Sequence, residues 1–136
     1  MRQDTTIQKQ DGINNAAWFL FSFKGRISRK PYWIFNLVVF LGAIVLGLFT
    51  EVSDDINNIT KPQLMFMLWI VWPSLAVQAK RWHDQDKSAY WLLVNFIPIA
   101  GPIWTMIQNG FVPGTRGPNR FGPDPLENQK EGIQQE

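Results

Sequence analysis

The stretch PYWIFNLVVFLGAIVLGLFT, residues 31–50, contains no charged side chain and decides the fold class. An α-helix rises ~1.5 Å per residue and the hydrocarbon core of a bilayer is ~30 Å thick, so about 20 apolar residues cross it. Two further stretches without Lys, Arg, Asp or Glu follow, at residues 62–79 and 89–112. A soluble helix would carry such residues along its exposed face. The three stretches therefore predict an all-α, polytopic membrane protein with three transmembrane helices.

The composition fits one compact unit in a membrane. The mean hydropathy of −0.12 looks soluble, but it averages apolar blocks with strongly polar ends. Many of the seven Trp and ten Phe lie near the ends of the apolar blocks, where amphipathic rings meet the headgroups. We expect a polar tail at residues 1–15, a single helical membrane domain at residues 16–125 and a second polar tail at residues 126–136.

The two ends of this domain have their own features. Apolar residues in the region 13–23 are too few to cross a bilayer, and four basic residues follow them, so we expect a short N-terminal segment lying in the interface. The third stretch contains Pro98, Gly101 and Pro102, which predict a break in the helix there.

The charge distribution orients the chain, because cytoplasmic loops favour Lys and Arg. Residues 1–30 carry six basic and two acidic side chains, whereas residues 51–62 carry one and three, and residues 80–88 three and two. Three crossings then predict a cytoplasmic N-terminus and an external C-terminus. Arg116 and Arg120 do not fit this prediction, because they follow the third stretch. If the break made that stretch re-entrant, they would return to the cytoplasm; we expect three crossings.

The segment KRWHDQDK, residues 80–87, is the densest polar cluster and contains the only His. His83 beside Asp84 is compatible with acid–base chemistry or a metal ligand. A metal site needs three or four ligands, however, and the chain has no second His and no Cys. The alternative is structural: Asp84 and Asp86 pair with neighbouring cations and fix the turn. We favour the structural alternative and expect no catalytic residue, metal or cofactor.

Three polar motifs resemble a known family. They are FSFKGRISRKPYW (21–33), WPSLAVQAKRWHDQDKSAYWLL (72–93) and PGTRGPNRFGPDP (113–125). Together they resemble the domain of unknown function 805, the YhaH/YhaI-type small bacterial inner-membrane proteins. The resemblance implies a polytopic protein of the bacterial inner membrane, and it carries over no activity. The charged groups within the motifs form our candidate interaction surface: Arg26, Arg29, Arg81, His83, Asp84 and Arg120.

These observations predict a non-enzymatic assembly or interaction component with a basic cytoplasmic surface. Its expected partners are anionic lipid headgroups, other membrane proteins or further copies of the chain, and not nucleic acid, since the net charge is only +2. The alternatives are an oligomeric small pore or transporter, with Pro73 and the break at 98–102 lining a path, and an enzyme acting on lipid headgroups through His83 and Asp84. The spans contain no ionisable residue, which argues against transport by a monomer.

Overall fold

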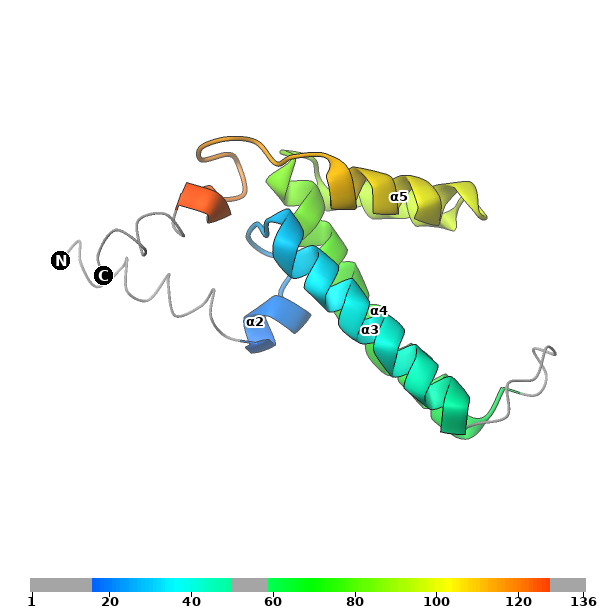
Figure 1. Cartoon of the computed structure of the whole chain (residues 1–136). Coiled ribbons are helices and arrows are strands. Elements are labelled where there is room, and N and C mark those ends of the chain that lie inside the picture. Colours follow the sequence, from blue (N-terminus) through cyan, green and yellow to red (C-terminus); the bar gives the residue numbers. More distant parts are fainter. Residues whose placement is uncertain (1–15, 50–58, 128–136) are drawn as a thin grey trace.

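The computed structural model describes residues 16–49 and 59–127. Within these ranges every regular element is a helix, and the β pairing is limited to one isolated bridge between Asn119 and Gly122. The predicted tail at 1–15, residues 128–136 of the predicted tail at 126–136, and residues 50–58 in the first loop lie outside the described residues. The elements are α2 (Ala16–Phe21), α3 (Arg29–Phe49), α4 (Lys61–Asp84), the 3-10 helix η2 (Ala89–Phe96) and α5 (Ala100–Phe111) (Figure 1).

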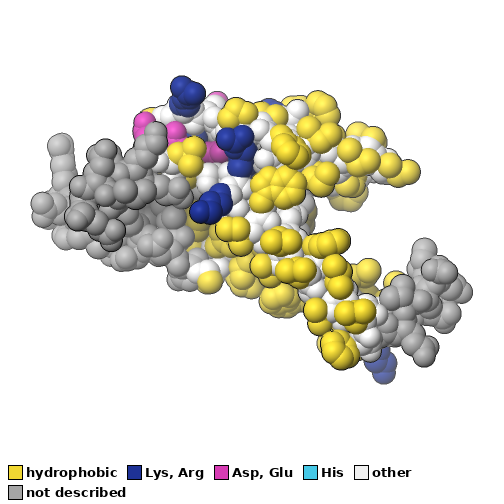
Figure 2. All heavy atoms as spheres, in the orientation of Figure 1, with side chains coloured by type: hydrophobic (Ala, Val, Ile, Leu, Met, Phe, Trp, Pro, Cys, Tyr) yellow, Lys and Arg dark blue, Asp and Glu magenta, His cyan; other side chains and the backbone are white. Residues whose placement is uncertain are grey.

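Helices α3 and α4 run side by side and form the long arm of the molecule (Figure 1). They have 21 and 24 residues, and both are long and apolar enough to cross a membrane. They contain the first two predicted spans. Only 11% of the most apolar window of α3 and 22% of that of α4 is buried, whereas the core helix of a soluble protein is mostly buried. Apolar side chains accordingly cover the outer surface of this arm (Figure 2).

The third predicted span is folded back on itself. Helix η2 leads away from the end of α4, the chain reverses at residues 97–99, and α5 returns along η2 (Figure 1). At the reversal the Ala100 N–H donates to the Pro98 carbonyl at 2.7 Å, and Ile99 has a φ of 64°. We call η2 and α5 together the hairpin arm.

Two contacts show that both ends of the hairpin arm lie at the C-terminal end of α4. Trp91, near the start of the arm, stacks on Trp82 with 5.5 Å between ring centroids. Val112, just past its end, accepts a hydrogen bond from Arg81 at 2.5 Å. The prediction of a third full crossing is therefore wrong, because neither the 8-residue η2 nor the 12-residue α5 spans ~30 Å.

The local sequence explains why the chain reverses here and does not merely kink. A Cβ on Gly101 would lie 2.0 Å from the Val94 carbonyl oxygen, so glycine lets the backbone of α5 meet the backbone of η2. Pro98 and Pro102 lack N–H groups, which removes the donors that a continuous helix would need at this point. Two prolines around a glycine thus end one helix and start another in the opposite direction.

The reversal also decides where the C-terminal segment lies. The Thr115 N–H donates to the Asp84 carbonyl at 2.7 Å, and Arg26 donates to the Thr115 carbonyl at 2.6 Å. Residues 113–124 therefore lie at the same end of the molecule as residues 22–28. The C-terminal segment therefore does not lie at the opposite end of the molecule from that N-terminal segment, as three full crossings would require.

Helix α2 occupies the predicted N-terminal segment and packs against α4. Its Trp18, Phe19 and Leu20 cover a small apolar core. That core consists of Ile27, Tyr32, Phe35 and Val77. It closes the polar end of the long arm, so the tightest packing lies where the connecting segments meet.

A larger side chain at residue 101 should disrupt the hairpin arm. We expect Gly101→Ala to lower the free energy of unfolding by about 1–3 kcal/mol, because the new Cβ overlaps the Val94 carbonyl. The measurement is SDS-titrated unfolding in mixed micelles, followed by Trp fluorescence. Gly42→Ala is the matched control, since a Cβ there would meet Phe66 at an ordinary 3.5 Å. Equal stability of the two variants would contradict the close approach of η2 and α5.

Candidate functional site

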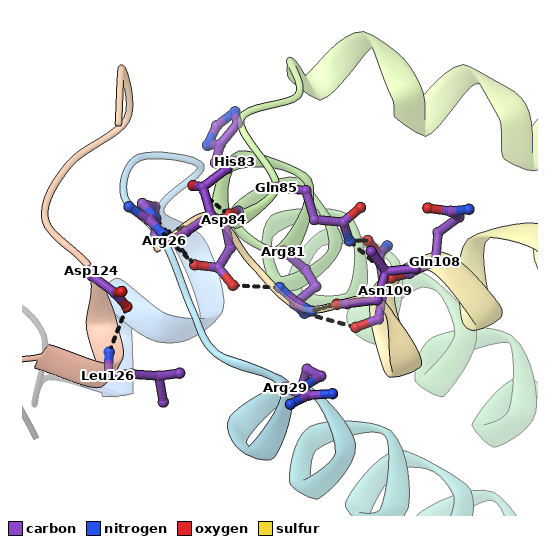
Figure 3. A network of polar contacts seen from close by, with 12 residues as sticks. Arg26, Arg29, Arg81, His83, Asp84, Gln85, Gln108, Asn109, Asp124 and Leu126 are labelled. Carbon is purple, nitrogen blue, oxygen red and sulfur yellow. Dashed lines mark hydrogen bonds and ion pairs between the residues drawn. The ribbon is translucent and has the colours of Figure 1, made fainter. Parts of the chain in front are cut away.

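Three segments that are far apart in the sequence meet at the C-terminal end of α4. They are residues 22–28, 80–88 and 113–126, and we call this region the polar cap. Figure 3 shows its centre, where Arg26 from the loop before α3 and Arg81 and Asp84 from the end of α4 point toward one another. The three family-like sequence motifs therefore come together in one structure.

The carboxylate of Asp84 lies at the centre of the polar cap, between two arginines (Figure 3). Its Oδ2 accepts from Arg81 Nη1 at 2.5 Å, and its Oδ1 accepts from Arg26 Nε at 3.1 Å. Side-chain exposure is 5% for Asp84, 1% for Arg26 and 0% for Arg81. Gly114 packs directly against this carboxylate, and a Cβ there would lie 2.0 Å from Oδ2. The two ion pairs are thus almost completely shielded from solvent.

Arg26 also organises the C-terminal segment. Its guanidinium donates to three backbone carbonyls of that segment: Thr115 at 2.6 Å, Gly117 at 2.8 Å and Gly122 at 3.2 Å. A guanidinium has five N–H donors in a rigid plane, which suits it to hold several oxygens at once. One side chain from before α3 therefore fixes the path of a segment about 90 residues later in the chain.

Arg81 performs the corresponding role for α5. It donates to the carbonyls of Asn109 at 2.7 Å and Val112 at 2.5 Å. The last carbonyls of a helix have no partner within the helix and attract cations. Arg81 thus closes the C-terminal end of α5 and binds the hairpin arm to α4, while it also pairs with Asp84.

His83 joins the same three segments through its ring. Its Nδ1 lies 3.2 Å from the Gly25 carbonyl, and the ring stacks on Phe121 with 3.9 Å between centroids. Its backbone carbonyl accepts from Asn119 Nδ2 at 2.9 Å. Asp124 stabilises the turn by accepting from the Gly117 N–H at 3.0 Å. These contacts of His83 are all with the polar cap itself.

Lys80 attaches α2 to α4. Its ammonium donates to the carbonyls of Trp18, Phe19 and Ser22 at 3.0, 2.5 and 2.7 Å, and it lies 4.7 Å from the centroid of the Trp18 ring. The side chain is fully buried. The carbonyls at the end of a helix and the face of an aromatic ring both favour a cation, which lets this charge stay buried without a carboxylate.

The structure divides the six candidate residues into two groups. Arg26, Arg81, His83 and Asp84 are buried and bonded to one another or to the backbone, so in this structure their side chains are not available on the surface of the chain. Arg29 and Arg120 are exposed. Arg120 pairs with Asp86 at 3.1 Å on the surface, with side-chain exposures of 64% and 42%. The predicted pairing of Asp84 with Arg81 is confirmed, but it is buried.

Sequence reasoning missed several members of the polar cap. It did not name Lys80, Thr115 or Asp124 as candidate residues. A signal was present: polar residues with short side chains recur in the Gly/Pro-rich segment 113–125, which is typical of an ordered turn that satisfies its own backbone. Within the residues that the structure describes, no group of three or more His, Cys, Asp or Glu side chains is arranged to hold a metal ion.

The arrangement of the polar cap has an energetic consequence. Moving a charge out of water costs several kcal/mol per ion, and removing one partner from a buried pair leaves the other uncompensated. Asp84→Asn should therefore lower the free energy of unfolding by about 3–5 kcal/mol, because two buried arginines lose their anion. SDS-titrated unfolding measures this.

Asp86→Asn is the matched control for Asp84→Asn. It also removes one ion pair two residues away, but that pair is exposed, so we expect a loss of only about 0–1 kcal/mol. Asn also tolerates the left-handed backbone of residue 86, which has a φ of 58°. Similar losses of unfolding free energy for both variants would show that the ion pairs of Asp84 do not stabilise the polar cap more than an exposed pair does.

Comparisons with known proteins find several relatives of this chain. Inner membrane protein YhaH of Escherichia coli K12 is 40% identical over 110 residues, covering 76% of this chain and 86% of the relative. Inner membrane protein YhaI of the same strain is 37% identical over 107 residues, covering 76% and 85%. The uncharacterized protein YiiR of that strain is 31% identical over 130 residues, covering 78% and 87%. No solved structure matches.

The family comparison covers nearly the whole described structure. The model of the family "Protein of unknown function (DUF805)" matches residues 20–123, a range that runs from the end of α2 through the polar cap. The resemblance found in the three motifs is thereby confirmed, and relatives named as inner membrane proteins support the bacterial inner membrane as the location. The chain belongs to the DUF805 family of proteins of unknown function.

Proposed function

We propose that this chain is a non-enzymatic interaction component of the bacterial inner membrane. It crosses the membrane twice through α3 and α4, holds the hairpin arm as a re-entrant element, and presents the polar cap to the cytoplasm. The observation that carries the proposal is that the polar cap uses its buried charges internally and leaves basic side chains on its outside.

Charge supports the cytoplasmic side for the polar cap. Among the residues that the structure describes, five exposed basic residues lie at this end of the molecule, and we call them the basic rim: Lys24, Arg29, Lys30, Arg116 and Arg120. Acidic residues 51, 54 and 55 belong to the connection at the other end of α3 and α4. The positive-inside rule then favours a cytoplasmic polar cap with the connection outside. Arg116 and Arg120, which do not fit three crossings, fit this topology.

The contacts within the polar cap support a structural role for its charged groups. A catalytic acid or base needs a proton-transfer partner in a site that a substrate can enter. The carboxylate of Asp84 is instead occupied by Arg26 and Arg81, and His83 lies between Gly25 and Phe121. This arrangement favours a structural role, in which these side chains hold the segments together, over the alternative of an enzyme acting on lipid headgroups. The alternative of an oligomeric pore lined by Pro73 gains no support, because that residue is fully buried.

The outside of the molecule offers surfaces for partners. The basic rim is suited to bind acidic segments of another protein or anionic headgroups at the membrane surface. The apolar faces of α3, α4 and the hairpin arm, which cover much of the surface in Figure 2, contact lipid or another membrane protein. We propose that the partner is another membrane protein or a second copy of this chain, recognised at the basic rim.

Photo-crosslinking in intact cells tests this role. We expect a benzoyl-phenylalanine residue in place of the exposed Pro118 to give a discrete product after illumination, identified by mass spectrometry as a heteromer or a homodimer. The double variant Arg116→Gln/Arg120→Gln should reduce the product several-fold, because both removed charges border residue 118 and rim charges steer association.

The control for the rim variant is Glu127→Gln, which removes one exposed charge of the opposite sign from the same segment and should keep the product. A product that does not change when both arginines are removed would count against recognition by the basic rim. The same crosslinking residue can be placed at residues 24 and 30. If none of the three positions gave a discrete product, the proposal of an interaction component would be contradicted.

A further inference from the structure

The hairpin arm and the long arm form a notch. Helices α3 and α5 touch where Trp33 meets the end of α5: its Nε1 donates to the Gly110 carbonyl at 3.1 Å, and its ring meets Phe111 at 5.6 Å between centroids. Beyond this contact the two helices part, because α3 continues along the long arm and α5 runs back toward residue 100 (Figure 1). Figure 2 shows apolar side chains on both arms and the open space between them.

One stripe of α3 lines the notch and changes character along its length. Residues 29, 33, 37, 40 and 44 recur at the spacing of a single helix face. The first is the exposed cation Arg29, and the others are Trp33, Leu37, Phe40 and Ile44, with exposures of 39, 56, 62 and 43%. This face therefore starts with a positive charge and continues with four exposed apolar side chains.

The opposite wall is apolar as well. Ile103, Ile107 and Phe111 lie three to four residues apart on α5, and they are 51, 44 and 62% exposed. Arg29 connects the two walls where they meet, because its Nη1 donates to the Phe111 carbonyl at 3.2 Å. This bond leaves further N–H groups of the guanidinium free to bind an anion. Lys30 is exposed beside it.

We propose that this notch binds a phospholipid with an anionic headgroup. Its phosphate lies on Arg29 and Lys30, and an acyl chain lies along the α3 stripe against Ile103 and Ile107. The positive charges where the two walls meet match the headgroup of such a lipid, and the apolar stripe of α3 matches its acyl chain. A soluble anion would leave the apolar stripe unoccupied, and an uncharged chain would leave the basic residues without a partner. The inference deepens the proposed function, since it rests on the polar cap facing the anionic cytoplasmic surface.

Native mass spectrometry of the purified full chain in detergent tests the lipid site. The probes are phosphatidylglycerol, which carries a net negative charge, and phosphatidylethanolamine, which carries none. We expect one phosphatidylglycerol to be retained in preference to phosphatidylethanolamine. Arg29→Gln/Lys30→Gln should weaken its binding at least about ten-fold, because each basic residue contributes to holding an anionic headgroup.

Two matched controls make this test specific. Arg116→Gln/Arg120→Gln removes the same charge from the basic rim outside the notch and should keep the lipid. Leu37→Gln, on the stripe, should weaken binding. Val38→Gln should not, because Val38 is 63% exposed against 56% for Leu37 but lies about a hundred degrees around α3. Retention of both lipids alike, or equal effects of the notch variants and their controls, would overturn the proposal. Because lipid binding is measured on the isolated chain and the partner in cells, either proposal can fail alone.

Discussion

The carboxylate of Asp84 accepts hydrogen bonds from Arg81 in its own helix and from Arg26, 58 residues earlier in the chain. Each arginine then reaches backbone carbonyls of another segment: Arg81 at the end of α5, and Arg26 in the C-terminal segment. Buried charges in this arrangement are stable only as a set, because each would be costly alone. This constraint keeps both ends of the hairpin arm at one end of α4 and thereby sets the topology.

The sequence predicted the helical class and the positions of α3 and α4 because lipid leaves a simple signal, a long stretch without charge. It did not predict the path of the third stretch. Its 24 uncharged residues are compatible with one crossing or with two half-length helices, and hydropathy does not distinguish these alternatives. The decision depends on the contact between Gly101 and Val94 and on the grip of Arg81 on Val112, both of which are tertiary. Even so, the positive charges of Arg116 and Arg120 after the third stretch were a sequence signal against a third crossing.

The sequence predicted which residues belong to the candidate site better than it predicted what those residues do. Arg26, Arg81, His83 and Asp84 do lie together, since polar motifs outside the spans have few other places to go. Their burial was not predictable, because a charged residue near a helix end is usually exposed. Only the hydrogen-bond and ion-pair partners from three segments offset the cost of removing these charges from water. The exposed charges that remain, such as Arg29 and Arg120, mark where this molecule meets its surroundings.

Cysteine accessibility in intact cells tests most directly whether the chain returns to the side from which it started. The chain has no native Cys, so single cysteines at Lys24, Asn58 and Glu127 can each be treated with a membrane-impermeant maleimide. The fold described here predicts that residues 24 and 127 behave alike and are protected until the cells are permeabilised, while residue 58 is labelled at once. Labelling of residue 127 together with residue 58, with residue 24 protected, would restore the third crossing and contradict the closed polar cap.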